Sequence, residues 1–226
     1  MPVFLLSDKI EFPPAHLASR HGLLAVGGDL SQKRLLLAYR MGIFPWFSDD
    51  EPVMWWSPDP RLVLYPQEIK ISKTLKKIIR KNVFKVTMDL AFRDVIHYCA
   101  DARLKKGEGT WIVKDMIDAY CRLHESGFAH SVETWHQGEL AGGLYGVSLG
   151  NCFFGESMFT RISNASNVGL VKLVDFLNIL SFDMIDCQIP TDHLIRFGAR
   201  EVPRARFLEQ LERSLENPTK RGKWDI

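Results

Sequence analysis

Three strand-like stretches follow one another in the second half of the chain, and they restrict its fold more than any other feature. They cover residues 130–135, 140–148 and 151–155. The turn His136-Gln137-Gly138 joins the first two, and Gly150-Asn151 joins the last two. Turns this short and rich in Gly and Asn connect hairpin strands, so we expect these stretches to pair within one sheet.

Helical patterns and further strands surround these stretches. They are a strand at 83–88, helices at 90–101 and about 114–126, a helix at about 164–180, a strand at 184–187, a short helix at 192–197 and a last helix that opens at Pro203. The order β-α-α-β-β-β-α-β-α is that of the acetyltransferase-like (GNAT) fold, a mixed sheet with helices on both faces. We therefore expect an α+β fold, an analogy that carries no function by itself.

The first 65 residues have a different character. They are rich in Pro, Gly and Trp and contain one clear helix, which begins at Asp29 or Ser31 and ends at Gly42. The prolines of residues 43–60 oppose regular structure, so we expect a shaped loop there. We expect residues 1–65 to form a small N-terminal domain, and residues 66–226 to form the GNAT-like domain.

The whole positive excess of the chain lies in twelve residues. The net charge is +2, whereas residues 70–81 carry six basic side chains and no acidic one. Ser72 can cap a helix here, with Leu75, Ile78 and Ile79 on its apolar side. The helix is either a solvated surface or a docking surface for polyphosphate, most simply nucleic acid. The lack of acidic partners within the run favours the second interpretation.

Composition excludes several classes of protein. Apolar residues make up 46% of the chain and charged residues 25%, as in soluble globular proteins. No apolar run approaches the ~18 residues that span a bilayer, and the N-terminus lacks the basic region of a secretory signal. We expect a cytoplasmic protein. The four cysteines and seven histidines are scattered, without metal-ligand spacing, so we expect no metal and no cofactor.

Two binding motifs that the chain lacks limit the choice of acyl donor. A GNAT enzyme binds the pyrophosphate of acyl-coenzyme A on a glycine-rich turn after its fourth strand, but residues 156–165 contain no glycine. A phosphate-binding loop for nucleoside triphosphates is also missing. A donor that arrives activated and attached to RNA would fit both the sheet and the basic helix. Aminoacyl-tRNA, whose ester an amine can attack directly, is the natural candidate.

Seven longer motifs occur in order along the chain. They are Gly27-Gly28-Asp29-Leu30, Gly42-Ile43-Phe44-Pro45-Trp46-Phe47, Trp55-Trp56-Ser57-Pro58-Asp59-Pro60-Arg61, Gly109-Thr110-Trp111-Ile112, Gly142-Gly143-Leu144-Tyr145-Gly146-Val147, Phe154-Gly155-Glu156-Ser157-Met158-Phe159 and Asp186-Cys187-Gln188. Together they closely resemble the bacterial leucyl/phenylalanyl-tRNA–protein transferases, over about residues 22–207.

The resemblance implies an aminoacyltransferase. It would move Leu or Phe from Leu-tRNA or Phe-tRNA to the α-amino group of proteins with N-terminal Arg or Lys, and the product would carry an N-degron, a signal for protein degradation. It also implies a small N-terminal domain before a GNAT/Fem-like domain, in agreement with the pattern of predicted elements.

The resemblance also implies binding residues. Trp46 and Trp111 match tryptophans that hold the terminal adenosine, where an indole face can stack on a base. The pocket for the donor side chain would be lined by Leu144, Phe153, Met158, Leu170, Leu173, Leu177 and Ile185. The tRNA acceptor stem would be held through its phosphates by Lys70, Lys73, Lys76, Lys77, Arg80 and Lys81.

Three further residues are candidates for the chemistry. Asp186 and Gln188 alternate with Cys187 at the end of a strand, so both should share one face. We expect Gln188 to accept a hydrogen bond from the attacking amine, and Asp186 to polarise Gln188 and offset the developing positive charge. Glu156 would orient the aminoacyl or acceptor amine, or offer its charge to the cationic acceptor. A ribose hydroxyl of the tRNA could carry the proton instead.

Two other functions remain open at this point. The chain could be another N-acyltransferase of the same fold, using coenzyme A or another tRNA. It could also be a non-catalytic tRNA-binding module, which would bind tRNA in a salt-sensitive way without forming a product.

Overall fold

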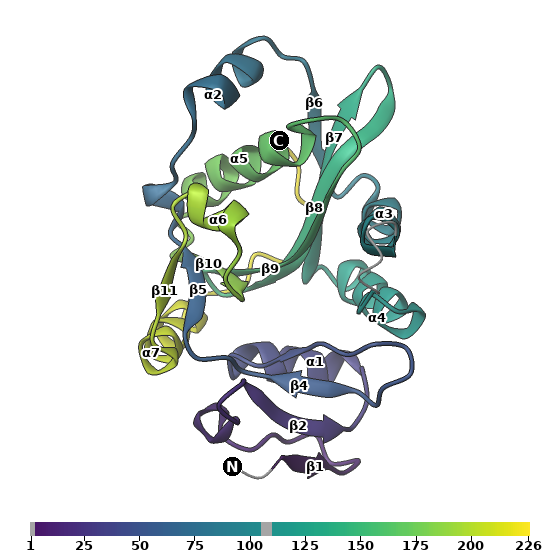
Figure 1. Cartoon of the computed structure of the whole chain (residues 1–226), viewed down its shortest axis with the longest axis vertical. Coiled ribbons are helices and arrows are strands. Elements are labelled where there is room, and N and C mark those ends of the chain that lie inside the picture. The colour runs from purple at the N-terminus through teal and green to yellow at the C-terminus, as the bar shows by residue number, and fades with distance from the viewer. Residues whose placement is uncertain (1–2, 105–109) are drawn as a thin grey trace.

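The computed structural model describes residues 3–104 and 110–226, which form two β-sheets (Figure 1). Gly109, in one of the seven motifs, lies outside these residues. The smaller sheet has the strand order β1-β2-β4-β3. Its strands are β1 (Phe4–Leu6), β2 (Leu23–Gly27), β3 (Phe44–Pro45) and β4 (Met54–Trp56). A short 3-10 turn, Ala15–Leu17, precedes β2.

Helix α1 (Gln32–Arg40) packs against the smaller sheet, and it forms where the sequence predicted it. The Ser31 hydroxyl accepts a hydrogen bond from the Arg34 backbone N–H, and Gly42 follows the helix in a left-handed conformation with φ +69°. The expectation of a wholly irregular segment after this helix is wrong, because Phe44–Pro45 pairs with β4. Strand β3 lies at the edge of its sheet, where a proline interrupts no ladder.

The larger sheet has the strand order β11-β5-β10-β9-β8-β7-β6. Its strands are β5 (Arg61–Leu64), β6 (Lys85–Met88), β7 (Ala129–His136), β8 (Glu139–Leu149), β9 (Cys152–Thr160), β10 (Met184–Gln188) and β11 (Arg200–Val202). Strands β7, β8 and β9 pair antiparallel, so both expected hairpins are confirmed. Strands β9 and β10 are parallel.

Strands β9 and β10 pair along only part of their length. Met184–Asp186 pairs with Cys152–Phe154, whereas β9 continues to Thr160. Glu156 and Gln188 lie beyond the last paired residues, where no ladder joins the two strands. The sheet therefore opens next to both side chains.

Helices cover both faces of the larger sheet. They are α2 (Lys73–Arg80), α3 (Phe92–Leu104), α4 (Lys114–Glu125), α5 (Ala165–Ile179), α6 (Asp192–Arg196) and α7 (Arg204–Leu215), with a 3-10 turn at Pro66–Glu68. Helices α3 and α4 lie on one face and α5 on the other (Figure 1). The expected order of elements after residue 83 is confirmed, with β11 added, and the fold is mixed α+β.

Strand β5 departs from the expected division at residue 65. It lies between β11 and β10 in the larger sheet, so residues 61–64 belong with the second region. All four of its residues are buried, and such a strand lacks the alternating pattern of a half-exposed one. The two sheets also share a hydrophobic core, in which Tyr39 of α1 packs against Phe154 of β9. No described helix is long and apolar enough to cross a membrane.

Candidate active site

A cavity of about 1150 Å³ opens where β9 and β10 separate. Its walls come from the strands β3, β8, β9 and β10, the helices α3, α5 and α6, and Trp111. The predicted site residues that line it are Trp46, Trp111, Leu144, Phe153, Glu156, Met158, Leu170, Leu173, Ile185 and Gln188. The fold thus brings together residues from both regions of the chain.

Two of the residues predicted for the donor pocket and the chemistry do not line this cavity. Leu177 is fully buried in the core behind it, among the other residues of α5. Asp186 is also fully buried and points toward Arg61. Period-two alternation alone does not show whether a buried side chain reaches a cavity or another strand, because both positions are shielded from water.

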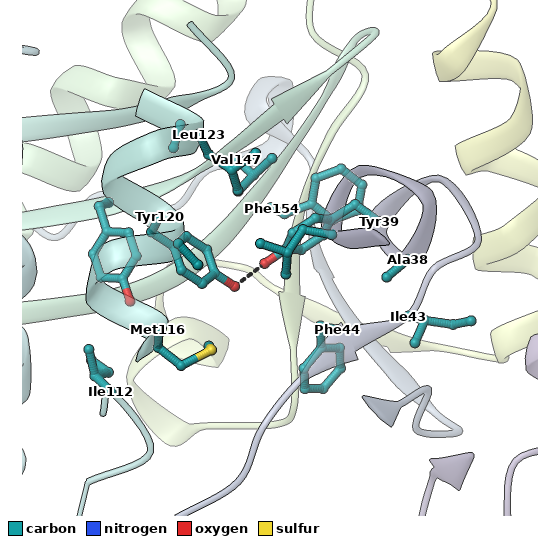
Figure 2. Close-up of a cluster of buried hydrophobic side chains, with 14 of the residues drawn as sticks. Ala38, Tyr39, Ile43, Phe44, Ile112, Met116, Tyr120, Leu123, Val147 and Phe154 are labelled. Carbon is teal, nitrogen blue, oxygen red and sulfur yellow. Dashed lines mark hydrogen bonds between the residues drawn. The ribbon is translucent and has the colours of Figure 1, made fainter. Parts of the chain in front are cut away.

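Glu156 is the best connected polar group at the cavity. The residue is 7% exposed, and its carboxylate accepts hydrogen bonds from the hydroxyls of Tyr39 at 2.8 Å and Tyr120 at 3.0 Å. The side-chain amide of Gln188 donates to the same carboxylate at 2.8 Å. Figure 2 shows Tyr39 and Tyr120 pointing toward one another from α1 and α4, with their hydroxyls hydrogen-bonded.

The environment of Glu156 favours its protonated form. Burial raises the pKa of Glu156 to about 7, although hydrogen bonds from Tyr39, Tyr120 and Gln188 favour the charged form. Burial also raises the pKa of both tyrosines well above the ordinary value. The hydroxyls of Tyr39 and Tyr120 and the carboxyl group of Glu156 contact one another in three pairs. Each hydrogen bond needs one proton, and the two phenols supply only two. A proton on Glu156 completes the ring of hydrogen bonds.

Asp186 forms a different kind of contact. Its two oxygens accept hydrogen bonds from the guanidinium of Arg61 at 2.8 and 2.7 Å, and both side chains are fully buried. The guanidinium lies over the rings of Phe44 and Phe207, at 4.8 and 4.7 Å from their centroids. Such a bidentate pair is already neutralised and held in place.

The expected contact between Asp186 and the Gln188 side chain is not formed. Asp186 accepts a hydrogen bond from the backbone N–H of Gln188 at 2.9 Å, while the Gln188 side chain is bonded to Glu156. A register shift between these residues and the left-handed conformation of Gln188, with φ +64°, turn the chain at this point. Asp186 therefore shapes the backbone of Gln188, and Glu156 contacts its amide.

Sequence reasoning missed Arg61, Tyr39 and Tyr120 as parts of this site. Arg61 ends one of the seven motifs, but its partner lies 125 residues away in the sequence. Each tyrosine lies on the apolar side of its helix, where a buried hydroxyl requires a partner. That requirement is a usable signal, although it does not identify the partner.

The tryptophans occupy two kinds of position. Trp46 is 37% exposed at the cavity, and its backbone carbonyl accepts a hydrogen bond from the Trp56 indole at 2.7 Å. Trp111 lines the same cavity. Trp55 is fully buried and donates to the carbonyl of Gly27 at 2.9 Å, which makes it part of the core.

The basic residues of the α2 region lie outside the cavity lining. Leu75 is buried against the rest of the molecule, while all six cationic side chains named above are exposed. No acidic group among the described residues lies within 4.0 Å of them. Among residues 3–104 and 110–226, no three His, Cys, Asp or Glu side chains are grouped so that they could hold a metal ion.

Comparisons with known proteins agree with the seven motifs. A family model described as leucyl/phenylalanyl-tRNA protein transferase matches residues 63–212, and the model of its N-terminal domain matches residues 28–59. A relative from Syntrophobacter fumaroxidans with the name leucyl/phenylalanyl-tRNA–protein transferase is 58% identical over 225 residues, covering 100% of this chain and 96% of the relative. A relative with the same name from Desulfatibacillum aliphaticivorans is 58% identical and is covered to 97%.

Two solved structures are more distantly similar. An aminoglycoside acetyltransferase from an uncultured soil metagenomic sample has a TM-score of 0.41 at 12% identity, over 52% of this chain and 86% of that one. A ribosomal-protein-alanine N-acetyltransferase from Brucella melitensis has a TM-score of 0.37 at 14% identity, over 57% of this chain and 89% of that one. On the strength of the family models and the full-length relatives, the chain belongs to the leucyl/phenylalanyl-tRNA–protein transferase family.

Proposed function

We propose that this protein transfers Leu or Phe from aminoacyl-tRNA to the α-amino group of proteins that begin with Arg or Lys. The main support is that one cavity combines Trp46 and Trp111 with an apolar wall and the Glu156–Gln188 pair. Each part meets a need of the reaction: a stacking site for adenosine, a pocket for an apolar side chain and polar groups for an amine. The product would carry an N-degron, and the reaction would take place in the cytoplasm.

The reaction is the aminolysis of an ester. The acceptor nitrogen attacks the ester carbonyl carbon, the carbon–oxygen bond to the ribose breaks, the amine loses a proton and the ribose oxygen gains one. The amine must be neutral to attack, whereas a free α-amino group has a pKa near ~8. The protein therefore has to bind the neutral amine and receive or redirect its proton.

Gln188 is the group we assign to the attacking amine. Its Nε2 donates to Glu156, so the amide is oriented with Oε1 available to accept a hydrogen bond from the amine. Asp186 and Arg61 hold the backbone of Gln188 in place. These contacts would fix the direction of attack, so that the two substrates are held in a reactive geometry.

Glu156 is the protein group we assign to the proton. A carboxyl with a pKa of about 7 can accept a proton at neutral pH and release it again. A ribose hydroxyl of the tRNA that passes the proton to the leaving oxygen is the competing route. A Glu156→Gln variant separates them, because the route through Glu156 predicts a loss of about 100-fold in transfer rate and the ribose route predicts a much smaller one.

The apolar wall of the cavity would accept the donor side chain. Leu144, Phe153, Leu170, Leu173 and Ile185 are buried or nearly so, and Met158 adds a flexible side chain. Such a pocket favours Leu and Phe over small side chains by only ~1–3 kcal/mol per methylene.

The decisive experiment combines the purified protein, Phe-tRNA and a peptide with N-terminal Arg. We expect a Phe-Arg-peptide, detected by mass spectrometry, and no product from the same peptide with N-terminal Ala. If well-folded protein forms no product, the assignment fails. Salt-sensitive tRNA binding without a product would favour a non-catalytic binding module, and acetyl-coenzyme A binding in calorimetry would favour an acyl-CoA enzyme.

The exposed cations of the α2 region are the proposed contact with the tRNA acceptor stem. Changing Lys76, Lys77 and Arg80 to Gln should weaken tRNA binding and reduce the slope of log affinity against log salt by about 2–3. Transfer from a minimal aminoacyl-adenosine donor should be unchanged. A Lys172→Gln variant, which removes an exposed cation of α5, is the control. Equal losses with both donors would show that α2 does not bind the RNA.

A further inference from the structure

The last ten residues form an irregular segment that packs on the core through Trp224, whereas the terminal Ile226 is exposed. This C-terminal segment, residues 217–226, contains no helix or strand. The Thr219 hydroxyl accepts a hydrogen bond from the backbone N–H of Gly150 at 2.9 Å, and the Arg221 guanidinium donates to the Ser126 carbonyl at 3.0 Å. The backbone N–H of Trp224 donates to the buried carboxylate of Asp89 at 2.8 Å. These contacts fix the segment close to the larger sheet.

The indole of Trp224 is inserted among aromatic side chains. It is 4% exposed and stacks on the ring of His130, with 3.7 Å between centroids and 5° between planes. Its other aromatic neighbours are Phe176 at 5.1 Å, Phe153 at 5.9 Å and Phe182 at 6.1 Å between centroids. The indole thus contacts the sheet on one side and the end of α5 on the other.

Phe153 connects this cluster to the cavity. It lines the cavity that contains Glu156 and Gln188, and it packs in the same core as Trp224. Its ring lies directly over Gly146, where an added Cβ would stand only 2.6 Å from ring carbons. Gly146 therefore leaves room for the ring but gives it no side chain to rest against, and Trp224 supplies a large neighbouring surface.

We propose that Trp224 is a positioning residue that sets the depth of the donor side-chain pocket by holding Phe153 in place. This inference rests on the proposed function, since it assumes that the apolar wall of the cavity receives the donor side chain. A smaller residue at 224 leaves unfilled space next to Phe153, and a well-packed wall becomes able to move. The pocket then accepts a larger donor and fits Leu less closely.

The test compares three donors, Leu-tRNA, Phe-tRNA and Trp-tRNA, with one Arg-peptide acceptor. In a Trp224→Leu variant we expect kcat/KM for the Trp donor to rise about tenfold relative to the Leu donor, the scale of selectivity that one or two methylene groups provide. The change should lie mainly in KM for Leu, because Trp224 does not contact the reacting atoms. A Trp224→Phe variant, which keeps an aromatic ring, should fall between wild type and Trp224→Leu.

A matched control weakens a different part of the core. Leu211→Ala on α7 removes a buried side chain from the core shared by the two sheets, so it should lower stability without changing the ratio of donors. If thermal unfolding shows that Trp224→Leu does not fold, the test uses Trp224→Phe instead. In that variant we expect kcat/KM for the Trp donor to rise about threefold relative to the Leu donor. An unchanged donor ratio in the folded Trp224 variants overturns the inference.

The two proposals fail in different ways. If the wild-type protein transfers neither Leu nor Phe, the proposed function is wrong whatever the Trp224 variants do. If the wild-type protein is active and both Trp224 variants affect the three donors by the same factor, the proposed function stands and only the role of Trp224 is refuted.

Discussion

Two buried carboxylates lie on neighbouring strands of the larger sheet and have opposite surroundings. Glu156 on β9 is bound by three neutral donors, two phenols and an amide. Asp186 on β10 is bound by the charged guanidinium of Arg61. The first group can exchange a proton near neutral pH, because burial raises its pKa to about 7. The second is held in one geometry by its bidentate pair with Arg61.

The difference shows how one sheet separates chemistry from support. Neutral donors orient Glu156 without compensating its charge, so its protonation state can follow the reaction. Arg61 compensates Asp186 fully and joins β5 to β10, and its guanidinium also donates to the carbonyl of Gly42 at 3.1 Å. Asp186 then holds Gln188 through the backbone.

Removing the charge of Asp186 should damage the structure. In Asp186→Asn the guanidinium of Arg61 stays buried without a counter-charge, so we expect the free energy of unfolding to fall by about 3–5 kcal/mol. Urea unfolding measures this. Glu68→Gln is the control, because the Glu68–Arg200 pair is exposed and screened by water, so its loss should change the free energy of unfolding far less. Similar small losses in both variants would contradict a supporting role for Asp186.

Glu156 should make stability depend on pH. Its pKa in the folded protein, about 7, exceeds its ordinary value of 4.5, so the folded state binds the proton more tightly than the unfolded state. The resulting stabilisation is complete below the ordinary value and is lost as pH rises through about 7. This stabilisation amounts to about 3 kcal/mol, because a shift of one pKa unit corresponds to 1.36 kcal/mol.

The measurement compares the wild type with Glu156→Gln, which cannot titrate. Their difference in free energy of unfolding should change by about 3 kcal/mol between about pH 5 and about pH 8, with the wild type losing stability as pH rises. Parallel curves for the two proteins would show that Glu156 titrates as it does in the unfolded chain.

Tyr39 should tune the activity of Glu156 without being required for the fold. Its hydroxyl favours the charged carboxylate, so Tyr39→Phe should raise the pKa of Glu156 and move the midpoint of the pH–rate profile upward by about one unit. Tyr65→Phe is the matched control, because it removes a hydroxyl that donates to Gln210 at 2.8 Å, outside the cavity lining. If both variants keep the wild-type midpoint, the hydroxyl of Tyr39 does not influence Glu156.

The success of sequence reasoning depended on the range of each interaction. The helices at residues 32–40 and 73–80 follow from local signals, because a Ser cap and apolar spacing lie within a few residues of each other. The short strands β1 to β5 and β11 were not predicted, since two to five residues carry little periodicity. Pairing with distant strands decides whether they form.

The candidate site shows the same limit. Motifs identified Trp46, Trp111, Glu156 and Gln188, and the fold places all four at one cavity. The same reasoning assigned Asp186 to the amide of Gln188, because the two residues are neighbours in a strand. It could not foresee that Arg61 would occupy that carboxylate or that two tyrosines would surround Glu156.

The sequence by itself determined the order of helices and strands after residue 83 except for β11, the basic character of residues 70–81 and the types of side chain available for chemistry. Only the tertiary structure decided which of these side chains meet. Tyr39 and Glu156 are 117 residues apart, and Arg61 and Asp186 are 125 apart. Such contacts, and the protonation states that depend on them, arise when strands from distant parts of the chain pair and exclude water. A pattern of neighbouring residues in the sequence contains no information about that pairing.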